Sequence, residues 1–247
     1  MLNKTFCHIK GISINHEKLL WENGIAHWDD FNLKSAQINC LPKSKLEKIK
    51  SELDISKAAL EKRDLAYFKR ALPPKEHWRL AALGKIAYVD IETTGISRGS
   101  DGITIIGIYD GITPHIYIKG QNLEEAHAKL LEFDTVVTFN GKQFDLPFIE
   151  SHFSTAYDFV HLDLRYMLKE LGLQGGLKSI EQQLGIERDA TVQGVDGFEA
   201  VNLWYQYKRG NLAALQKLLV YNREDIVNLK ALLDYYLSKK QRLLFGL

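Results

Sequence analysis

The pattern of hydrophobic and polar positions divides the chain near residue 80. Before that point, apolar residues recur at helix-like spacing, and residues 44–72 read as one or two amphipathic helices. After residue 85, short runs rich in β-branched and aromatic residues end at Gly or Asn, which is typical of strands. These runs lie at residues 85–92, 104–111, 114–120 and 134–141, and a fifth strand is predicted within 158–164.

The second part of the chain combines strands with helices. A helix is predicted at residues 123–133, and from about residue 165 the pattern is mostly helical, ending in a long helix at 212–237. Three strands, then alternating helices and strands, then helices alone indicate an α/β fold in which helices pack on a mixed sheet. The predicted organisation is a helical region at residues 1–80 followed by an α/β domain at 81–247.

Charge is distributed unevenly over these two regions. The chain has 247 residues and a formal net charge of +1, but residues 32–79 carry twelve Lys and Arg against six acidic residues. Such a basic helical region is either a small bundle with a solvated lysine face or a surface that contacts nucleic acid, because Lys and Arg neutralise phosphates. Since charge runs are usually solvated, the region taken alone favours the first interpretation.

Composition excludes several classes of protein. Hydrophobic residues make up 45% of the chain and charged residues 26%, which excludes a disordered or collagen-like chain. The two cysteines, Cys7 and Cys40, lack the spacing of a metal knuckle and favour a reducing compartment. The sequence has neither the hydrophobic run of a signal peptide nor a stretch long enough to span a membrane. We therefore expect a cytoplasmic protein without a membrane partner.

Two acidic residues occupy a predicted strand where charge is costly. Asp90 and Glu92 alternate on this strongly apolar strand, so both point to one face, about 7 Å apart along the backbone. Two like charges on one face need a compensating cation. A DxE pair by itself is a weak signal for a metal site, since short motifs recur by chance.

Two further acidic residues lie on predicted helices. Asp145 lies where a helix begins after a strand, so it either complements the helix dipole or joins a site at the end of that strand. Asp225 shares one face of the long helix with Tyr221 and with apolar residues at 218, 229 and 232. It either forms a structural pair with the Tyr221 hydroxyl or belongs to a functional site.

Four carboxylates in one pocket would repel one another unless they shared divalent cations. A ligand set made only of oxygen suits Mg²⁺ or Mn²⁺, and no His or Cys is spaced to complete a zinc site. The sequence also lacks a GxGxxG or Walker loop, so a nucleotide enzyme that cradles phosphates is not expected.

Three motifs, taken in order, resemble a known family. VDIETTG (89–95), TFNGKQFD (138–145) and YNREDIVNL (221–229) are similar to the three exonuclease motifs of the DEDD superfamily, which has a ribonuclease-H-like fold. The third motif contains Tyr221-x-x-x-Asp225, as in the tyrosine (DEDDy) branch that includes proofreading domains of family B polymerases. Over nearly its whole length the chain also resembles the bacterial YprB-like ribonuclease-H-like proteins.

This resemblance implies a metal-dependent 3′→5′ exonuclease that hydrolyses phosphodiester bonds of DNA or RNA and releases nucleoside 5′-monophosphates. Two divalent cations, Mg²⁺ or Mn²⁺, would be bound. One would be held by Asp90, Glu92 and Asp225, and the other by Asp90 and the substrate phosphate, with Asp145 acting directly or through water. Tyr221 would orient the attacking water, because a tyrosine pKa of about 10 makes it a poor base.

The resemblance also implies that the substrate is the 3′ end of single-stranded DNA or RNA. Contacts to the terminal nucleotide are expected from Thr93, Thr94, Gly95, Asn140 and Phe144, although Phe144 equally fits a core position.

Two alternatives to the exonuclease can be distinguished from it by the acidic residues and the tyrosine of these motifs. A non-catalytic nucleic-acid-binding module would keep the fold without turnover, and a missing acidic residue would favour it. A structure-selective endonuclease of the same fold, such as a ribonuclease H or a junction resolvase, does not use the Tyr-x-x-x-Asp helix. All four acidic residues and the tyrosine are present, which favours the exonuclease.

Overall fold

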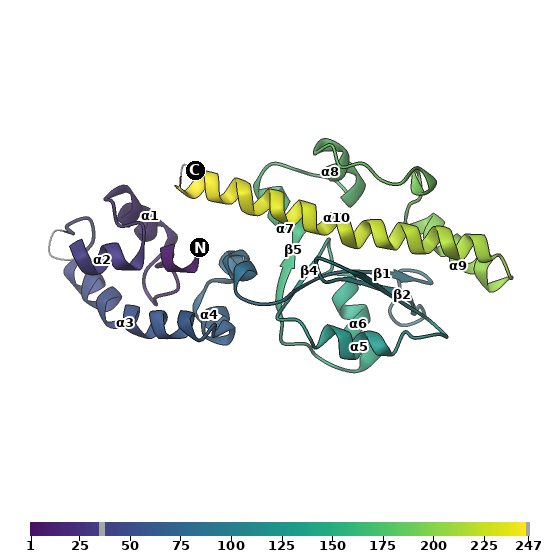
Figure 1. Ribbon diagram of the computed structural model, residues 1–247, viewed down its shortest axis with the longest axis horizontal. Helices are drawn as coiled ribbons and strands as arrows, with labels where there is room; N and C mark the ends of the chain where they lie inside the picture. The colour runs from purple at the N-terminus through teal and green to yellow at the C-terminus, as the bar shows by residue number, and fades with distance from the viewer. Residues whose placement is uncertain (35–37, 246–247) are drawn as a thin grey trace. The chain divides into compact units, whose positions relative to one another are not determined.

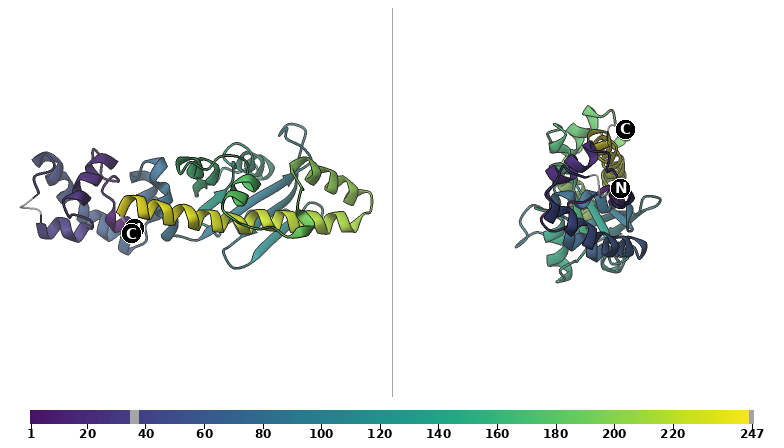
Figure 2. Two further views of the ribbon diagram at one scale, coloured as in Figure 1. Left: turned by 90° about the horizontal axis from the view of Figure 1, so that it is seen from above. Right: turned by 90° about the vertical axis from the view of Figure 1, so that its left-hand side faces the viewer.

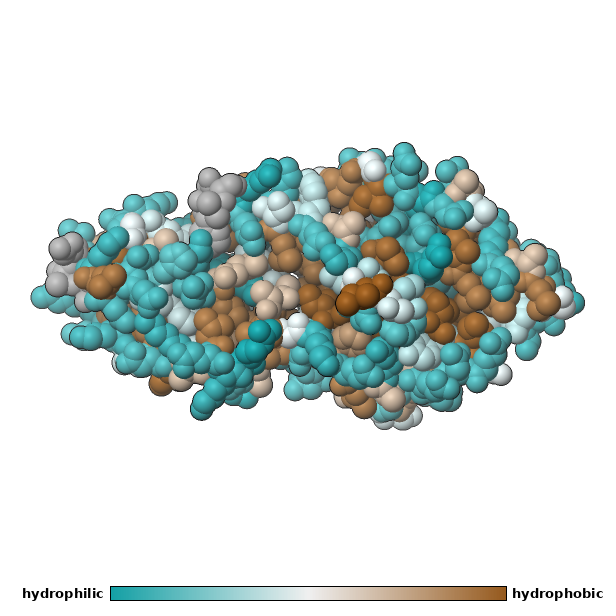
Figure 3. All heavy atoms as spheres, in the orientation of Figure 1, coloured by the Kyte–Doolittle hydropathy of each residue, from teal (hydrophilic) through white to brown (hydrophobic). Residues whose placement is uncertain are grey.

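The computed structural model describes residues 1–34 and 38–245, and the chain forms two compact units with the boundary between Gly84 and Lys85 (Figure 1). On the face shown in Figure 3, hydrophilic side chains predominate and hydrophobic ones form separate, smaller groups. None of the described helices is both long and apolar enough to cross a membrane.

The first unit consists of helices, as the hydrophobic pattern predicts. In chain order they are η1 (Leu2–Lys4), α1 (Ile14–Glu22), α2 (Trp28–Lys34), α3 (Lys43–Glu61), α4 (Leu65–Ala71) and η3 (Pro74–Ala82). The stretch predicted as one or two helices is two, because Arg63 adopts a φ of 52° and Asp64 then caps α4. The buried residues of α3 are Ile49, Leu53, Ser56 and Ala59, and none of its lysines is buried.

A buried ion pair ties the amino-terminal segment of this unit to η3. The Glu17 carboxylate on α1 is completely buried and accepts hydrogen bonds from the backbone N–H groups of Phe6 and Cys7. Its other oxygen accepts from Arg79 Nη2 at 2.7 Å, and Arg79 Nε donates to Glu76 at 2.8 Å. Because a buried charge is costly without a partner, each group of this network depends on the others.

The second unit is built on a five-stranded mixed sheet, so the predicted fold class is confirmed. The strands are β1 (Ile86–Thr93), β2 (Ile103–Tyr109), β3 (Pro114–Ile118), β4 (Thr135–Thr138) and β5 (Val160–Asp163). Their order in the sheet is β3-β2-β1-β4-β5. The central strand β1 pairs with β2 antiparallel and with β4 parallel.

Helices cover both faces of this sheet (Figures 1 and 2). One face is covered by α5 (Glu125–Leu130) and α6 (Asp145–Phe153), and the other by α9 (Gly197–Lys208) and α10 (Leu212–Phe245). The elements between β5 and α9 are α7 (Leu164–Glu170), α8 (Leu177–Gln183) and η4 (Ala190–Val192). Figure 2 shows α10 running across the sheet, and it contacts the first four strands.

Alternation along β1 separates its apolar residues from its acidic ones. Val89 and Ile91 belong to the hydrophobic core on the side of α5 and α6. Asp90 and Glu92 therefore face α10, which lies on the opposite side of the strand. The central position of β1 thus places two carboxylates under the longest helix of the molecule.

We predict that Arg79→Met lowers the free energy of unfolding of the first unit by about 3–5 kcal/mol, because it leaves Glu17 buried without its cation. Tryptophan fluorescence during denaturation follows this loss, since Trp21, Trp28 and Trp78 lie in the first unit. The control is Lys57→Met, which removes the exposed pair with Asp29 and should change stability little. Equal effects of the two substitutions would contradict the prediction.

Candidate metal centre

Three carboxylates from two elements converge between the sheet and α10. Asp90 and Glu92 come from β1 and Asp225 comes from α10, and each offers an oxygen atom within 4.8 Å of the others. Asp225 is 4% exposed and Glu92 is 7% exposed. Three buried or half-buried carboxylates so close together require positive charge between or beside them.

Asp145 lines the same cavity but is not a member of that close group of three. It begins α6, is 3% exposed, and accepts a hydrogen bond from the backbone N–H of Ile91 at 3.2 Å. The cavity has a volume of about 250 Å³, and its walls include all four carboxylates together with Tyr221. Asp145 thus lies both at the start of a helix and in the wall of the cavity that the other three carboxylates line, so the two positions that the sequence presented as alternatives are compatible.

Burial and mutual repulsion make these carboxyl groups unusually hard to ionise. Burial is the main cause for each, and it raises the pKa of Asp145 to about 7 and that of Asp225 to about 6. For Asp90 and Glu92, burial and then the charge of Asp225 raise the pKa well above its usual range. At neutral pH the protein therefore does not supply enough positive charge to stabilise all four carboxylates in their ionised form.

Arg188 supplies one positive charge and was not predicted from the sequence. Its guanidinium donates to Asp225 Oδ1 at 2.5 Å and to both oxygens of Glu181, at 2.6 and 2.7 Å. Glu181 also accepts from Asn228 of α10 at 3.1 Å. Burial tends to lower the pKa of Arg188, but the hydrogen bond to Glu181 and the charge of Asp225 outweigh it and raise the pKa.

Tyr221 lies one helical turn before Asp225 and lines the cavity. Burial, followed by the charge of Asp225, raises the pKa of its hydroxyl above the ordinary tyrosine value. The Lys178 ammonium lies over the Tyr221 ring, 4.4 Å from its centre. Within the described residues, the hydrogen bond that reaches Asp225 comes from Arg188 rather than from Tyr221, so the structural Tyr–Asp pair is not formed.

A glycine on β2 lets α10 approach the sheet at the acidic group. Gly107 pairs with Asp90 in the sheet, and a Cβ atom at Gly107 would overlap Asn222 Oδ1 and lie 3.0 Å from Ile226. Asn222 is completely buried and donates to Asp90 Oδ2 at 3.0 Å. Gly107 and Asn222 thus position Asp90 beneath α10, and neither was predicted. The signal available for Gly107 was a glycine inside an otherwise β-branched strand.

The donor set of this site fits a divalent cation. All of its charged ligands are carboxylate oxygens, which suit Mg²⁺ or Mn²⁺. Glu92 Oε1 is buried and has no hydrogen-bond partner among the described residues. An unsatisfied buried carboxylate oxygen beside two further carboxylates is the environment that a cation stabilises.

The residues predicted to contact substrate fall into two groups. The cavity that the four carboxylates line, called the acidic cavity below, is also lined by Thr93, Gly95, Asn140 and Phe144. Thr94 is not part of its lining and instead donates to Asp101 Oδ1 at 3.1 Å. Gly95 packs closely on Asp101, and a Cβ atom at Gly95 would lie 2.6 Å from the Asp101 carboxylate. This contact explains the glycine without any role in substrate binding.

The chain belongs to the RNase H superfamily, which residues 87–237 match. It therefore carries an RNase H-like nuclease fold with a buried acidic group of residues, and this superfamily suggests a phosphodiester hydrolase. No curated protein sequence matches the chain.

Solved structures share the fold at low sequence identity. A family B DNA polymerase from the hyperthermophilic archaeon Pyrobaculum calidifontis is 13% identical with a TM-score of 0.50, over 64% of this chain and 24% of the polymerase. This chain thus spans about a quarter of that protein. The apo form of a nuclease is 18% identical over 64% of this chain and 74% of its own, with a TM-score of 0.47. Brucella melitensis NrnC bound to pGG is 21% identical over 69% and 80%, with a TM-score of 0.45.

We predict that, in the presence of chelator, the stability of the wild-type protein falls relative to Asp145→Asn as the pH rises from about 4 to about 7. The raised pKa of Asp145 means that the folded state binds its proton more tightly than the unfolded state. This stabilisation is complete below the unfolded pKa and is lost as the pH rises through the folded pKa of about 7. Urea denaturation at several pH values, followed by circular dichroism, measures the difference.

The control for this experiment is Asp234→Asn, an exposed acidic residue on the same helix as Asp225. It should leave the pH dependence of wild-type stability unchanged. Adding Mg²⁺ or Mn²⁺ at pH 7.5 should stabilise the wild type more than Asp145→Asn, because a ligand of the folded state shifts the unfolding equilibrium. Parallel pH profiles for wild type and Asp145→Asn would refute the electrostatic account of the site.

A second prediction concerns Gly107→Ala, which should destabilise the second unit by about 1–3 kcal/mol through overpacking against α10. Denaturation of the full chain measures the stability. Titration with Mn²⁺ measures the affinity of the protein for this ion, which should fall because the displaced α10 carries Asp225. The double variant Gly107→Ala/Asn222→Ala should recover part of the stability, since it removes the overlapping amide. An unchanged stability in Gly107→Ala would contradict the close approach.

Proposed function

We propose that this chain is a metal-dependent 3′→5′ exonuclease of the tyrosine branch of the DEDD superfamily, close to the YprB-like proteins. It would act on the 3′ end of single-stranded DNA or RNA and release nucleoside 5′-monophosphates. The observation that carries this proposal is the convergence of Asp90, Glu92 and Asp225, whose oxygens lie within 4.8 Å, in a cavity shared with Asp145 and Tyr221.

In this proposal, Asp90, Glu92 and Asp225 would hold one divalent cation. Asp90 and the substrate phosphate would hold a second, with Asp145 acting directly or through water. Bound cations would supply a water of lowered pKa and positive charge for the phosphate and the leaving 3′ oxygen. The carboxylates themselves would bind and orient. Because their raised pKa values favour the protonated form, binding of a cation at neutral pH would release protons.

Tyr221 has a positioning role in the proposed reaction. Its raised pKa keeps the hydroxyl protonated at neutral pH, so it donates a hydrogen bond and does not act as a base. Held on the same helix as Asp225, it would orient the attacking water toward the phosphate. Asn140 and Phe144, which line the cavity, would contact the terminal nucleotide.

The helical first unit has a proposed accessory role. The excess of Lys and Arg in residues 32–79 supports a contribution to nucleic-acid binding through counterion release.

A non-catalytic nucleic-acid-binding module is the second candidate. The observation that favours it is the bond between Arg188 and Asp225, because an internal cation already neutralises part of the acidic group. The first candidate is preferred because Arg188 engages one oxygen of Asp225 and Glu92 Oε1 still lacks a partner among the described residues.

The test uses 5′-labelled single- and double-stranded DNA and RNA and a circular single strand, with Mg²⁺, Mn²⁺ or chelator. We expect a ladder that shortens from the 3′ end, is lost in chelator, and falls by about a hundredfold or more in Asp225→Asn. Tyr221→Phe should lower the turnover number more than it weakens substrate binding, because the hydroxyl acts on the water and not on the strand.

The matched control is again Asp234→Asn, which removes a carboxylate of α10 outside the cavity and should keep full activity. Tight binding without cleavage in the wild type would support the non-catalytic module. Cleavage of the circular strand would indicate an endonuclease. An unchanged turnover number in Tyr221→Phe would remove the water-orienting role.

A further inference from the structure

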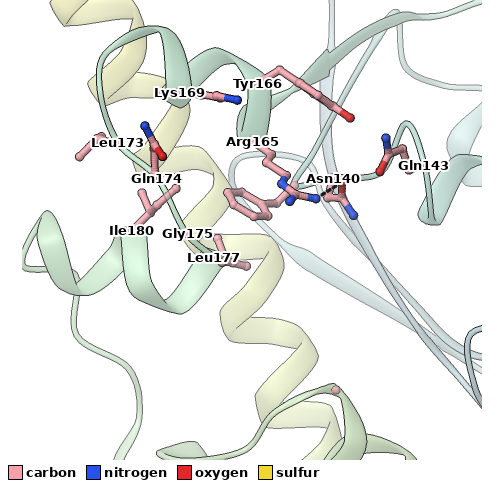
Figure 4. Close-up of a pocket in the computed structure, with 13 residues that line it drawn as sticks. Asn140, Gln143, Arg165, Tyr166, Lys169, Leu173, Gln174, Gly175, Leu177 and Ile180 are labelled. Atoms are coloured by element: carbon pink, nitrogen blue, oxygen red, sulfur yellow. Dashed lines mark hydrogen bonds between the residues drawn. The ribbon is translucent and has the colours of Figure 1, made fainter.

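A second cavity, of about 770 Å³, shares lining residues with the acidic one. Figure 4 shows the side chains that line this second cavity. We call it the α7 cleft, and it lies between the loop after β4, the outer side of α7 and the segment before α8. Phe139, Asn140 and Gly197 line both cavities, so the two lie side by side. Its volume lies in the range of about 300–1,000 Å³ that is typical of ligand pockets, whereas the acidic cavity is smaller than that range.

The α7 cleft carries the opposite charge to its neighbour. Arg165 and Lys169 are four residues apart on α7 and therefore share one face of the helix. Neither forms an ion pair with a carboxylate in the described part of the chain, and none of the residues that line the cleft is acidic. Two unneutralised cations beside an acidic site are complementary to the phosphates of a bound strand.

Arg165 is held in place and does not extend freely into solvent. Its Nη1 donates to Asn140 Oδ1 at 2.7 Å, across the cleft from α7 to the loop after β4 (Figure 4). The remaining N–H groups of the planar guanidinium suit bidentate binding of a phosphate. Asn140 adopts a φ of 66°, a left-handed conformation that Asn tolerates better than most residues.

Asp163 fixes the loop and α7 relative to each other. Its buried carboxylate accepts from the backbone N–H groups of Asn140, Lys142 and Arg165, at 2.8, 3.1 and 3.1 Å. One carboxylate at the end of β5 thus organises both walls of the cleft. The cleft is therefore preorganised, which lowers the entropic cost of binding a flexible ligand.

An exposed aromatic residue completes the wall of the cleft. Tyr166 is 43% exposed on α7, next to Arg165, and Phe139 lies partly exposed where the two cavities join. Exposed aromatic rings beside cations are the features with which proteins bind single strands, because any base can stack on them.

We propose that the α7 cleft binds the nucleotides that precede the terminal one in a single-stranded polynucleotide, with Arg165 and Lys169 on phosphates and Tyr166 stacked on a base. This inference rests on the proposed function, since the terminal nucleotide would occupy the acidic cavity. The cleft then gives the protein a preference for strands of several nucleotides over mononucleotides.

The test measures binding separately from hydrolysis. Fluorescence anisotropy of labelled oligothymidylate and oligouridylate of about eight nucleotides is recorded in the Asp225→Asn background with Mg²⁺, which keeps the strand intact. Adding Arg165→Gln and Lys169→Gln should weaken binding about tenfold or more and reduce the slope of log K against log salt by about 0.7 for each lost phosphate contact. An added mononucleotide should displace little of the labelled oligonucleotide.

The matched control is Lys208→Gln/Arg209→Gln, which removes two exposed cations at the end of α9, outside both cavities. An equal loss of affinity in this control, or no loss in Arg165→Gln/Lys169→Gln, would overturn the proposal. Tyr166→Ala should weaken binding, and Tyr166→Phe should restore it, because stacking needs the ring alone. Circular dichroism verifies that each variant is folded.

The two proposals fail separately. If the wild type hydrolyses strands from the 3′ end but the α7 variants bind strands normally, the cleft proposal is wrong and the exonuclease stands. If the α7 variants lose strand binding but the wild type hydrolyses nothing, the cleft proposal stands and the exonuclease does not.

Discussion

The burial of like charges is the constraint on which the second unit depends. Asp90, Glu92 and Asp225 each offer an oxygen atom within 4.8 Å of the others, in a place where burial already disfavours ionisation. Such a group cannot be stable on packing alone, and the chain surrounds it with donors. Asn222 donates to Asp90, Arg188 donates to Asp225, and the backbone of Ile91 donates to Asp145. A carboxylate has two oxygens, so Asp225 can keep Arg188 on one of them and offer the other to a cation.

The same constraint explains the local sequence of the elements around the site. β1 is apolar on one side, and its acidic residues face α10, which contributes a third carboxylate and a hydrogen-bond donor. α10 carries Tyr221, Asn222 and Asp225 within five positions, and Gly107 provides the room for its approach. Glu181 lies outside the cavity yet belongs to this arrangement, because it holds Arg188 and is itself held by Asn228.

Much of the fold and part of the site were predictable from the sequence, for reasons that can be named. Runs of β-branched and aromatic residues are a local property, so they correctly predicted the five strands, and strand alternation indicated that Asp90 and Glu92 share a face. Helix periodicity placed Tyr221 and Asp225 on one stripe, and the structure buries all five residues of that stripe: Leu218, Tyr221, Asp225, Leu229 and Leu232. These inferences needed only the spacing of residues along one element.

The remainder of the site depends on contacts between distant segments, which spacing does not encode. Arg188 lies in the connection between α8 and α9, among charged neighbours that resemble an ordinary solvated loop, and its partner is 37 residues away. Glu181 looks like a surface residue of a polar helix but is 1% exposed. The need for a compensating cation at Asp90 and Glu92 was evident from the sequence, whereas the identity of the cationic side chain was not.

The arrangement of strands also decides where positive charge can lie. The acidic residues come from the central strand and the helices that begin or run over it, whereas Arg165 and Lys169 follow the edge strand β5. The sheet therefore separates carboxylates from the cations of α7, and so Arg165 pairs with the neutral oxygen of Asn140 and not with the acidic group. If Arg165 and Lys169 had reached the carboxylates, the charges of the two groups would neutralise each other. Asp163 maintains this separation, because it uses its own charge on backbone N–H groups and holds the loop between the two cavities in one conformation.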